Sequence, residues 1–259
     1  MSLTDKNLSA TYKDLLIIDN ANAGFDTNLD QVKSGNGIGS ALYLSKDASK
    51  LQPNADSTTL KQVFDKDGNL LFLIDSTNDY VKAGINQHHI NTQYAHFGID
   101  SLSSATYGST DHIQVPFGVA KTQTAGRFGT GTNPDTSYTI STDADDIVVG
   151  LWYIPDGITI DACSVWVGGD ASTGDTVRFH LMSFDIDTSN TSTGGDLTNG
   201  VVLADGSDIT TAGYEQAYFQ QMTIQSSAVT SGKVVMFFFK SDSTNSDYSI
   251  KTTVKYHLT

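Results

Sequence analysis

Residues 248–258 read Tyr-Ser-Ile-Lys-Thr-Thr-Val-Lys-Tyr-His-Leu, and this stretch decides the fold of the C-terminal part of the chain. Large or β-branched side chains occupy every second position, and mostly polar side chains stand between them. A repeat of two residues belongs to an extended strand, because successive side chains of a strand point to opposite faces. The stretch therefore predicts an antiparallel strand with one face buried and the other in water.

The chain also avoids glutamate. Of its 29 acidic residues only Glu215 is a glutamate, and the aspartates stand among Gly, Ser, Thr and Asn. Glu favours helices, whereas Asp bonds to nearby backbone groups and favours turns. We therefore expect an all-β protein of short strands joined by polar turns.

Strand patterns recur through residues 114–259. The expected ranges are 137–141, 146–153, 158–167, 176–186, 201–203, 217–224 and 233–240. With 248–258 they make about eight strands, which predict an antiparallel β-sandwich of the jelly-roll type. We expect Phe237-Phe238-Phe239 in a central strand that is covered on both faces. The lone cysteine, Cys163, is expected to be a buried strand residue.

Two continuous apolar blocks stand out in the first 113 residues: Leu15, Leu16, Ile17 and Ile18, and Leu71, Phe72, Leu73 and Ile74. Continuous blocks predict strands that need cover on both faces, yet this part of the chain has too few apolar residues to supply it. We expect β segments intertwined around a threefold axis, with these eight residues at the interface of a homotrimer. A hairpin is expected at Asp67-Gly68.

These patterns suggest three regions. Residues 1–55 are interpreted as an N-terminal β region, 56–113 as a trimeric stalk and connector, and 114–259 as the sandwich. Residues 84–113 hold histidine and aromatic residues with little periodicity, which favours a connector, with a short helix over 86–96 as an alternative.

The formal net charge of −14 limits the partners. Nucleic-acid binding needs clustered Lys and Arg, and the chain has only two arginines, Arg127 and Arg178. We expect no nucleic-acid partner. The start of the chain does not read as a signal peptide, and no apolar run is long enough to span a membrane, so we expect no membrane insertion.

No catalytic pattern of nucleophile and base, phosphate loop or metalloprotease type occurs, and we expect neither an enzyme nor a cofactor. Asp65-Lys66-Asp67-Gly68-Asn69 resembles the start of a calcium loop but lacks its later ligands, so a turn is expected there. Two other aspartate groups, 143–146 and 185–187, and the histidines His88, His89 and His96 lack convincing metal-ligand spacing. We expect no metal.

Exposed aromatic residues give a weaker alternative, a sugar-stacking surface on the sandwich. Tyr214 and Tyr218 stand beside an expected loop and are the candidate glycan contacts. Trp152 and Trp166 lie within or at the end of expected strands, and we expect both in the core.

Residues 12–47 contain the segments Leu-Ile-Ile-Asp-Asn, Ala-Asn-Ala-Gly, Ser-Gly-Asn-Gly and Ala-Leu-Tyr-Leu-Ser. Val-Phe-Asp-Lys-Asp-Gly-Asn-Leu-Leu at 63–71 and Asp-Tyr-Val-Lys at 79–82 follow. This style of repeat, over residues 12–85, resembles segments of tailed-bacteriophage fibre and decoration proteins. The resemblance implies a homotrimer on the outside of a virion, made in the host cytoplasm, with an N-terminal region that attaches to capsid or tail proteins. Two roles stay open: a head decoration, head-fibre or tail-fibre component, or a receptor-binding tip that recognises a host surface glycan.

Overall fold

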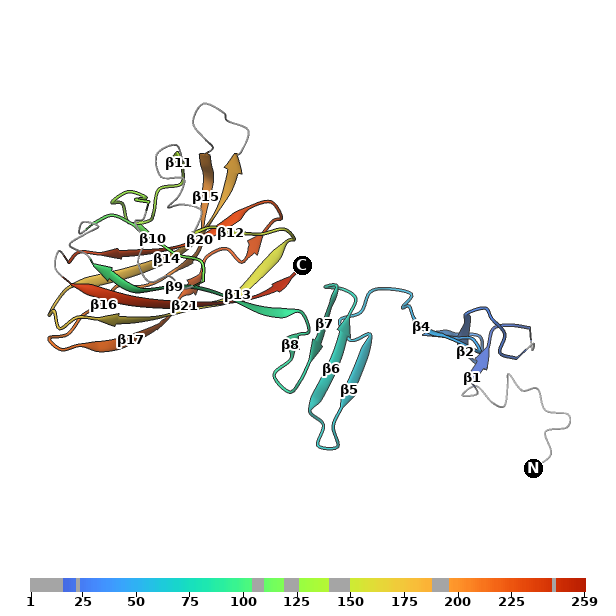
Figure 1. Cartoon of the computed structure of the whole chain (residues 1–259). Coiled ribbons are helices and arrows are strands. Elements are labelled where there is room, and N and C mark those ends of the chain that lie inside the picture. Colours follow the sequence, from blue (N-terminus) through green and yellow to red (C-terminus); the bar gives the residue numbers. More distant parts are fainter. Residues whose placement is uncertain are drawn as a thin grey trace, which may run out of the picture. The chain divides into compact units, whose positions relative to one another are not determined.

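The computed structural model describes residues 16–21, 24–103, 110–118, 126–139, 150–187, 196–243 and 246–259. These residues form β-strands and no α-helix, which confirms the all-β expectation (Figure 1). Among them, no helix long and apolar enough to cross a membrane occurs. The chain divides into two compact units, Met1–Ile90 and Asn91–Thr259.

The second unit is a sandwich of two antiparallel sheets (Figure 1). Eight strands carry its topology: β9 Thr92–Ser103, β10 Ile113–Val115, β13 Ile158–Gly169, β14 Thr176–Asp187, β15 Asp196–Asp205, β17 Gln216–Gln221, β20 Val234–Ser241 and β21 Asp247–Leu258. One sheet has the order β9-β21-β13-β17 and the other the order β10-β20-β14-β15. The chain crosses to the other sheet after each of these strands except β14, which is followed by β15 in the same sheet; this is the strand order of a jelly roll and confirms the predicted fold.

Short strands complete both sheets. They are β11 Tyr138–Thr139, β12 Trp152–Tyr153, β16 Ile209–Thr210, β18 Thr223–Ile224 and β19 Ala228–Val229. β19 joins the sheet of β13, and the other four join the sheet of β20 and β14. The predicted strand over 146–153 appears only as β12, because residues 140–149 lie outside the described residues.

The core fills the space between the sheets and continues on the far face of the larger one. Phe237 and Phe239 of β20 belong to the inter-sheet core, whereas Phe238 belongs to a second cluster that contains Phe128. All three phenylalanines of β20 are buried, as predicted for a central strand with two covered faces. Cys163 and Trp152 are buried as expected, and burial raises the pKa of the Cys163 thiol to about 12.

The connector expected over residues 84–113 is wrong in its middle part. Residues 92–103 form β9, a full strand of the sandwich that pairs with β21 from Thr92↔His257 to Ser103↔Asp247. The helix considered over 86–96 is also wrong, since His88–His89 form the short strand β8. The sandwich unit therefore begins at Asn91, earlier than the expected boundary at 114.

The first unit contains two separate four-stranded antiparallel sheets. One has β1 Leu16–Ile18, β2 Asp30–Ser34, β3 Gly39–Leu44 and β4 Ser49–Leu51; the other has β5 Lys61–Phe64, β6 Leu70–Asp75, β7 Tyr80–Ala83 and β8 His88–His89. β5 and β6 form the predicted hairpin. The Asp65 carboxylate accepts bonds from the amides of Asp67 and Asn69, and Gly68 takes the positive φ that a turn there requires.

Neither of these sheets has a core of its own. Among the described residues up to Ile90, Val32 is the only buried apolar side chain. Leu16, Ile38, Ile85 and Ile90 are at least 65% exposed. Apolar side chains that remain this exposed in one chain, here in β1 and in the turns beside β3, β7 and β8, are typical of surfaces that another molecule covers.

Candidate functional site

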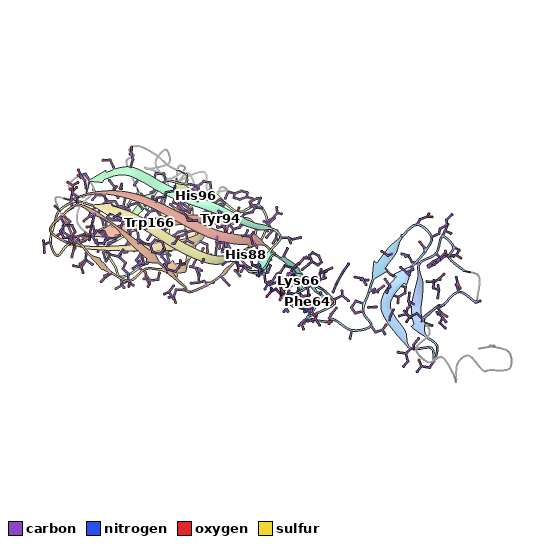
Figure 2. The ribbon with its side chains drawn as sticks, turned by 90° about the horizontal axis from the view of Figure 1, so that it is seen from below. Phe64, Lys66, His88, Tyr94, His96 and Trp166 are labelled. Carbon is purple, nitrogen blue, oxygen red and sulfur yellow. The ribbon has the colours of Figure 1, made fainter. Side chains whose placement is uncertain are left out.

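The outward face of the smaller sandwich sheet carries two exposed aromatic rings. Trp166 of β13 pairs directly with Phe219 of β17, and the ring centroids lie 4.9 Å apart. Trp166 is 53% exposed and Phe219 is 52% exposed. Figure 2 marks Trp166 on this sheet, together with Tyr94 and His96 of β9. The expectation that Trp166 lies in the core is wrong, because its neighbours Val165 and Val167 face the core and strand alternation turns Trp166 outward.

Two shallow pockets adjoin beside these rings, and we call them together the sheet-face groove. The larger has a volume of about 420 Å³ and is lined by Asp100, Ser101, Gly168, Gly169, Asp170, Glu215, Gln216, Asp247, Tyr248 and Ser249. The smaller has a volume of about 230 Å³ and is lined by Ile99, Trp166, Gly168, Ala217, Ser249, Ile250 and Lys251. Gly168 and Ser249 line both pockets, so they form the floor where the two meet.

The floor of the groove consists of small residues, which leave room above the sheet. A side chain on Gly168 would place its Cβ 2.6 Å from Ser249 Oγ, closer than two such atoms can approach. Gly168 pairs with Ala217 on one side and with Ser249 on the other, so three small residues lie side by side across β17, β13 and β21. Trp166 and Phe219 lie two residues further along the same strands; Trp166 lines the smaller pocket, and Phe219 packs beside it.

Carboxylates surround the larger pocket. Asp170 Oδ2 accepts a hydrogen bond from the Asp247 amide at 2.7 Å, which ties the end of β13 to the start of β21. Within the described part of the chain, the side chains of Asp100 and Glu215 make no hydrogen bond or ion pair in this structure. Their oxygens are thus free to accept hydrogen bonds from a ligand. Lys251 is the one cationic side chain among the groove-lining residues.

No protein-family model matches the sequence, and no curated protein matches it.

The two predicted glycan contacts differ in exposure, since Tyr214 is exposed and Tyr218 is half-buried. Tyr214 is 63% exposed and directly precedes Glu215 of the groove. Tyr218 instead packs against the inter-sheet core, and its hydroxyl accepts a hydrogen bond from the Ala212 amide at 2.8 Å. The next residue, Phe219, points to the outer face of the sheet and was not among the predicted glycan contacts. Strand alternation around the pair Tyr218-Phe219 was the available signal.

The predicted trimer-interface residues are accessible in the single chain. Leu16 and Ile17 are exposed, Leu71 is 38% exposed, and Ile18, Phe72, Leu73 and Ile74 are half-buried. Leu15 lies outside the described residues. The structure also separates the members of the second block: Phe72 and Ile74 share one face of β6, and Leu73 lies on the other.

Cross-strand pairs identify the apolar face of this sheet. Phe72 pairs with Val63 and Ala83, and Ile74 pairs with Val81, so these five residues share one face, which we call the β6 apolar face. Lys61, the other partner of Ile74, lies at one end of this face. The opposite face is more polar, because Leu73 pairs there with Gln62 and Lys82. Leu71, which is 38% exposed, lies on that opposite face with Leu73, so apolar side chains remain uncovered on both faces of β6.

Asp65, Asp185, His89 and His96, four of the residues considered as metal ligands, contact other groups of the chain, whereas the aspartate group at 143–146 lies outside the described residues. The Asp65 carboxylate is used by its own turn, and Asp185 accepts hydrogen bonds from Lys233 and Asn199. The His89 ring packs edge-on against Tyr80 at 5.0 Å, and His96 Nδ1 lies 3.2 Å from the carbonyl oxygen of Thr252. Among the described residues, no cluster of three or more metal-ligating side chains occurs.

Proposed function

We propose that this protein is a homotrimeric structural component of a bacteriophage virion, a head decoration, head-fibre or tail-fibre protein. Its N-terminal unit attaches it to capsid or tail proteins, and its jelly roll is displayed on the outside of the particle. One contrast supports this proposal above all: the jelly roll has a complete core of its own, whereas Val32 is the only buried apolar residue described before Asn91.

Sister copies of the chain would bury the apolar side chains that the N-terminal unit leaves exposed. The β6 apolar face repeats identically in every copy, so copies arranged around a threefold axis can bury the same face against one another. Burial of apolar area contributes about 25 cal/mol per Å², which offsets the missing intrachain core. The resemblance of residues 12–85 to phage fibre and decoration segments supports both the number of copies and the location on a virion.

The oligomeric mass of the full chain tests the assembly. Sedimentation equilibrium should give three times the chain mass of 27.8 kDa at micromolar concentration. A stable 27.8 kDa monomer would contradict the trimer.

Display on a particle needs a separate test. Antibodies against the jelly roll should label intact purified virions of the source phage in electron micrographs, and peptides of this chain should be abundant in those virions. Absence of the chain from purified particles would contradict a structural role in the virion.

The receptor-binding role remains the second candidate, and one observation favours it. The exposed pair Trp166 and Phe219 stands beside a groove on the unit that the proposed assembly would display. A purely structural knob has no need of two large apolar rings in water.

A further inference from the structure

We propose that the sheet-face groove binds a neutral saccharide, with a pyranose ring stacked on Trp166 and in contact with Phe219, whose ring is inclined by 48° to that of Trp166, and with its hydroxyls bonded to Asp100 and Glu215. The inference gives a ligand class to the second role above, and it rests on the proposed function only for the display of the jelly roll. No other copy of the chain is needed to form the groove, since all its residues belong to one jelly roll.

The aromatic pair suits a small, flat and partly apolar ligand. The two rings are half-exposed and adjacent, and they belong to strands whose backbones are already paired on this sheet. Two side chains are far too small an apolar area for a stable protein–protein interface, which buries more than about 1,000 Å². They are wide enough to pack against the C–H face of one sugar ring.

The rest of the groove suits hydroxyl groups. A saccharide hydroxyl donates one hydrogen bond, and a carboxylate accepts such bonds more strongly than a neutral oxygen does. Asp100 and Glu215 line the larger pocket, which adjoins the aromatic pair through Gly168 and Ser249. An apolar wall beside a few polar acceptors is the usual composition of a small-ligand site.

The negative charge of the groove favours neutral over anionic saccharides. Four carboxylates line the groove against Lys251 alone, and the whole chain carries a net charge of −14. Sulfated, phosphorylated or uronate polymers would meet like charge there, which disfavours their binding. A neutral hexose polymer has no such penalty.

A cationic peptide is the competing occupant for an acidic groove. Peptides that add to a sheet bind alongside an exposed strand edge, whereas the groove lies on the face of the sheet, over β9, β13, β17 and β21. Attraction of a peptide by charge alone is screened by salt, whereas stacking of a neutral sugar is not. Salt dependence therefore separates the two occupants.

A glycan microarray that holds neutral, sulfated and uronate oligosaccharides tests the proposal on the full-length protein. We expect binding to neutral hexose oligosaccharides that persists at about 1 M salt. Trp166→Ala and Phe219→Ala should each raise the half-saturating concentration about ten-fold or more, equivalent to the loss of a stacked ring. Asp100→Asn with Glu215→Gln tests the hydroxyl acceptors and should weaken binding as well.

Tyr153→Ala is the matched control, because Tyr153 is 57% exposed but lies on β12 of the other sheet. Its binding should stay within about two-fold of the parent protein. The proposal is overturned by an absence of binding to every neutral glycan, by unchanged binding of both ring variants, or by preferential binding of an oligolysine peptide that salt abolishes. Sedimentation of the same samples keeps the two proposals apart, since a monomer that binds sugar contradicts only the trimer, and a trimer that binds none contradicts only the groove.

Discussion

His180 on β14 is fully buried, and its ring centroid lies 5.0 Å from that of His112. His180 Nδ1 lies 3.2 Å from Asp205 Oδ1, but neither ring nitrogen makes a hydrogen bond within the described residues. Burial, with a smaller contribution from His112, lowers the pKa of His180 to about 4 against the opposing effect of Asp205. Burial also lowers the pKa of His112. The jelly roll therefore holds two neutral histidines close together.

The stability of the jelly roll should depend on these histidines. The unfolded chain binds a proton at each of them near pH 6.5, whereas folded His180 resists protonation until about pH 4. The stability that depends on these histidines being neutral is therefore fully present above pH 6.5 and is lost as the pH falls below it. His180 alone should make the free energy of unfolding about 2 kcal/mol lower at about pH 5 than at about pH 7.5, as measured by urea unfolding.

A variant isolates the effect of His180. His180→Gln should flatten the difference in unfolding free energy between the two pH values, whatever it does to absolute stability. His88→Gln is the control, because His88 is exposed on β8. An unchanged pH dependence in His180→Gln would show that other groups carry it.

At the scale of elements, β20 is the strand on which both clusters of the core depend. Phe238 is fully buried, and its ring centroid lies 4.7 Å from that of Phe128 and 6.1 Å from that of Phe184. Phe238→Ala would leave a cavity and should lower the unfolding free energy by about 3–5 kcal/mol. Phe219→Ala, on the exposed face, should change it by about 0.5 kcal/mol or less. Equal losses of urea midpoint in the two variants would contradict this view of the core.

Strands with a two-residue repeat or a continuous apolar run could be predicted from the sequence, and β9 shows why others could not. The ranges 158–167, 176–186, 233–240 and 248–258 correspond closely to β13, β14, β20 and β21. In β9 the buried residues Ala95, Phe97 and Ile99 alternate, but a register shift opposite Tyr248 and Ile250 moves the next buried residue to Leu102. This bulge breaks the repeat, and the polar and histidine residues around it favoured a connector instead.

The groove could not be predicted from the sequence for a different reason. Its lining comes from β9, β13, β17 and β21, which are far apart along the chain and adjacent only in the sheet. No local motif could bring Asp100 and Glu215 to the same pocket. Trp166 could have been placed outward by alternation with Val165 and Val167, but the general tendency of strand tryptophans to be buried led to the opposite expectation.

For the whole molecule, the two units should differ in their need for partners. The jelly roll buries its own core, so a fragment of residues 91–259 should be a folded monomer. Its urea midpoint should match that of the jelly roll in the full chain.

A fragment of residues 1–90 should show strand structure by circular dichroism only at concentrations at which it associates. Concentration-independent folding of the 1–90 fragment as a monomer would contradict the need for cover.

The β6 apolar face identifies which residues the assembly should bury. Phe72→Asp would place a carboxylate between Val63 and Ala83 on this face, and a charge that is desolvated in an interface without a partner costs several kcal/mol. The variant should therefore sediment as a monomer with an unchanged jelly-roll unfolding transition. Gln62→Asp adds the same charge to the opposite face of the neighbouring strand β5 and should leave the trimer intact. If both variants remained trimeric, copies would associate through another surface; if both dissociated, charge rather than burial of this face would govern assembly.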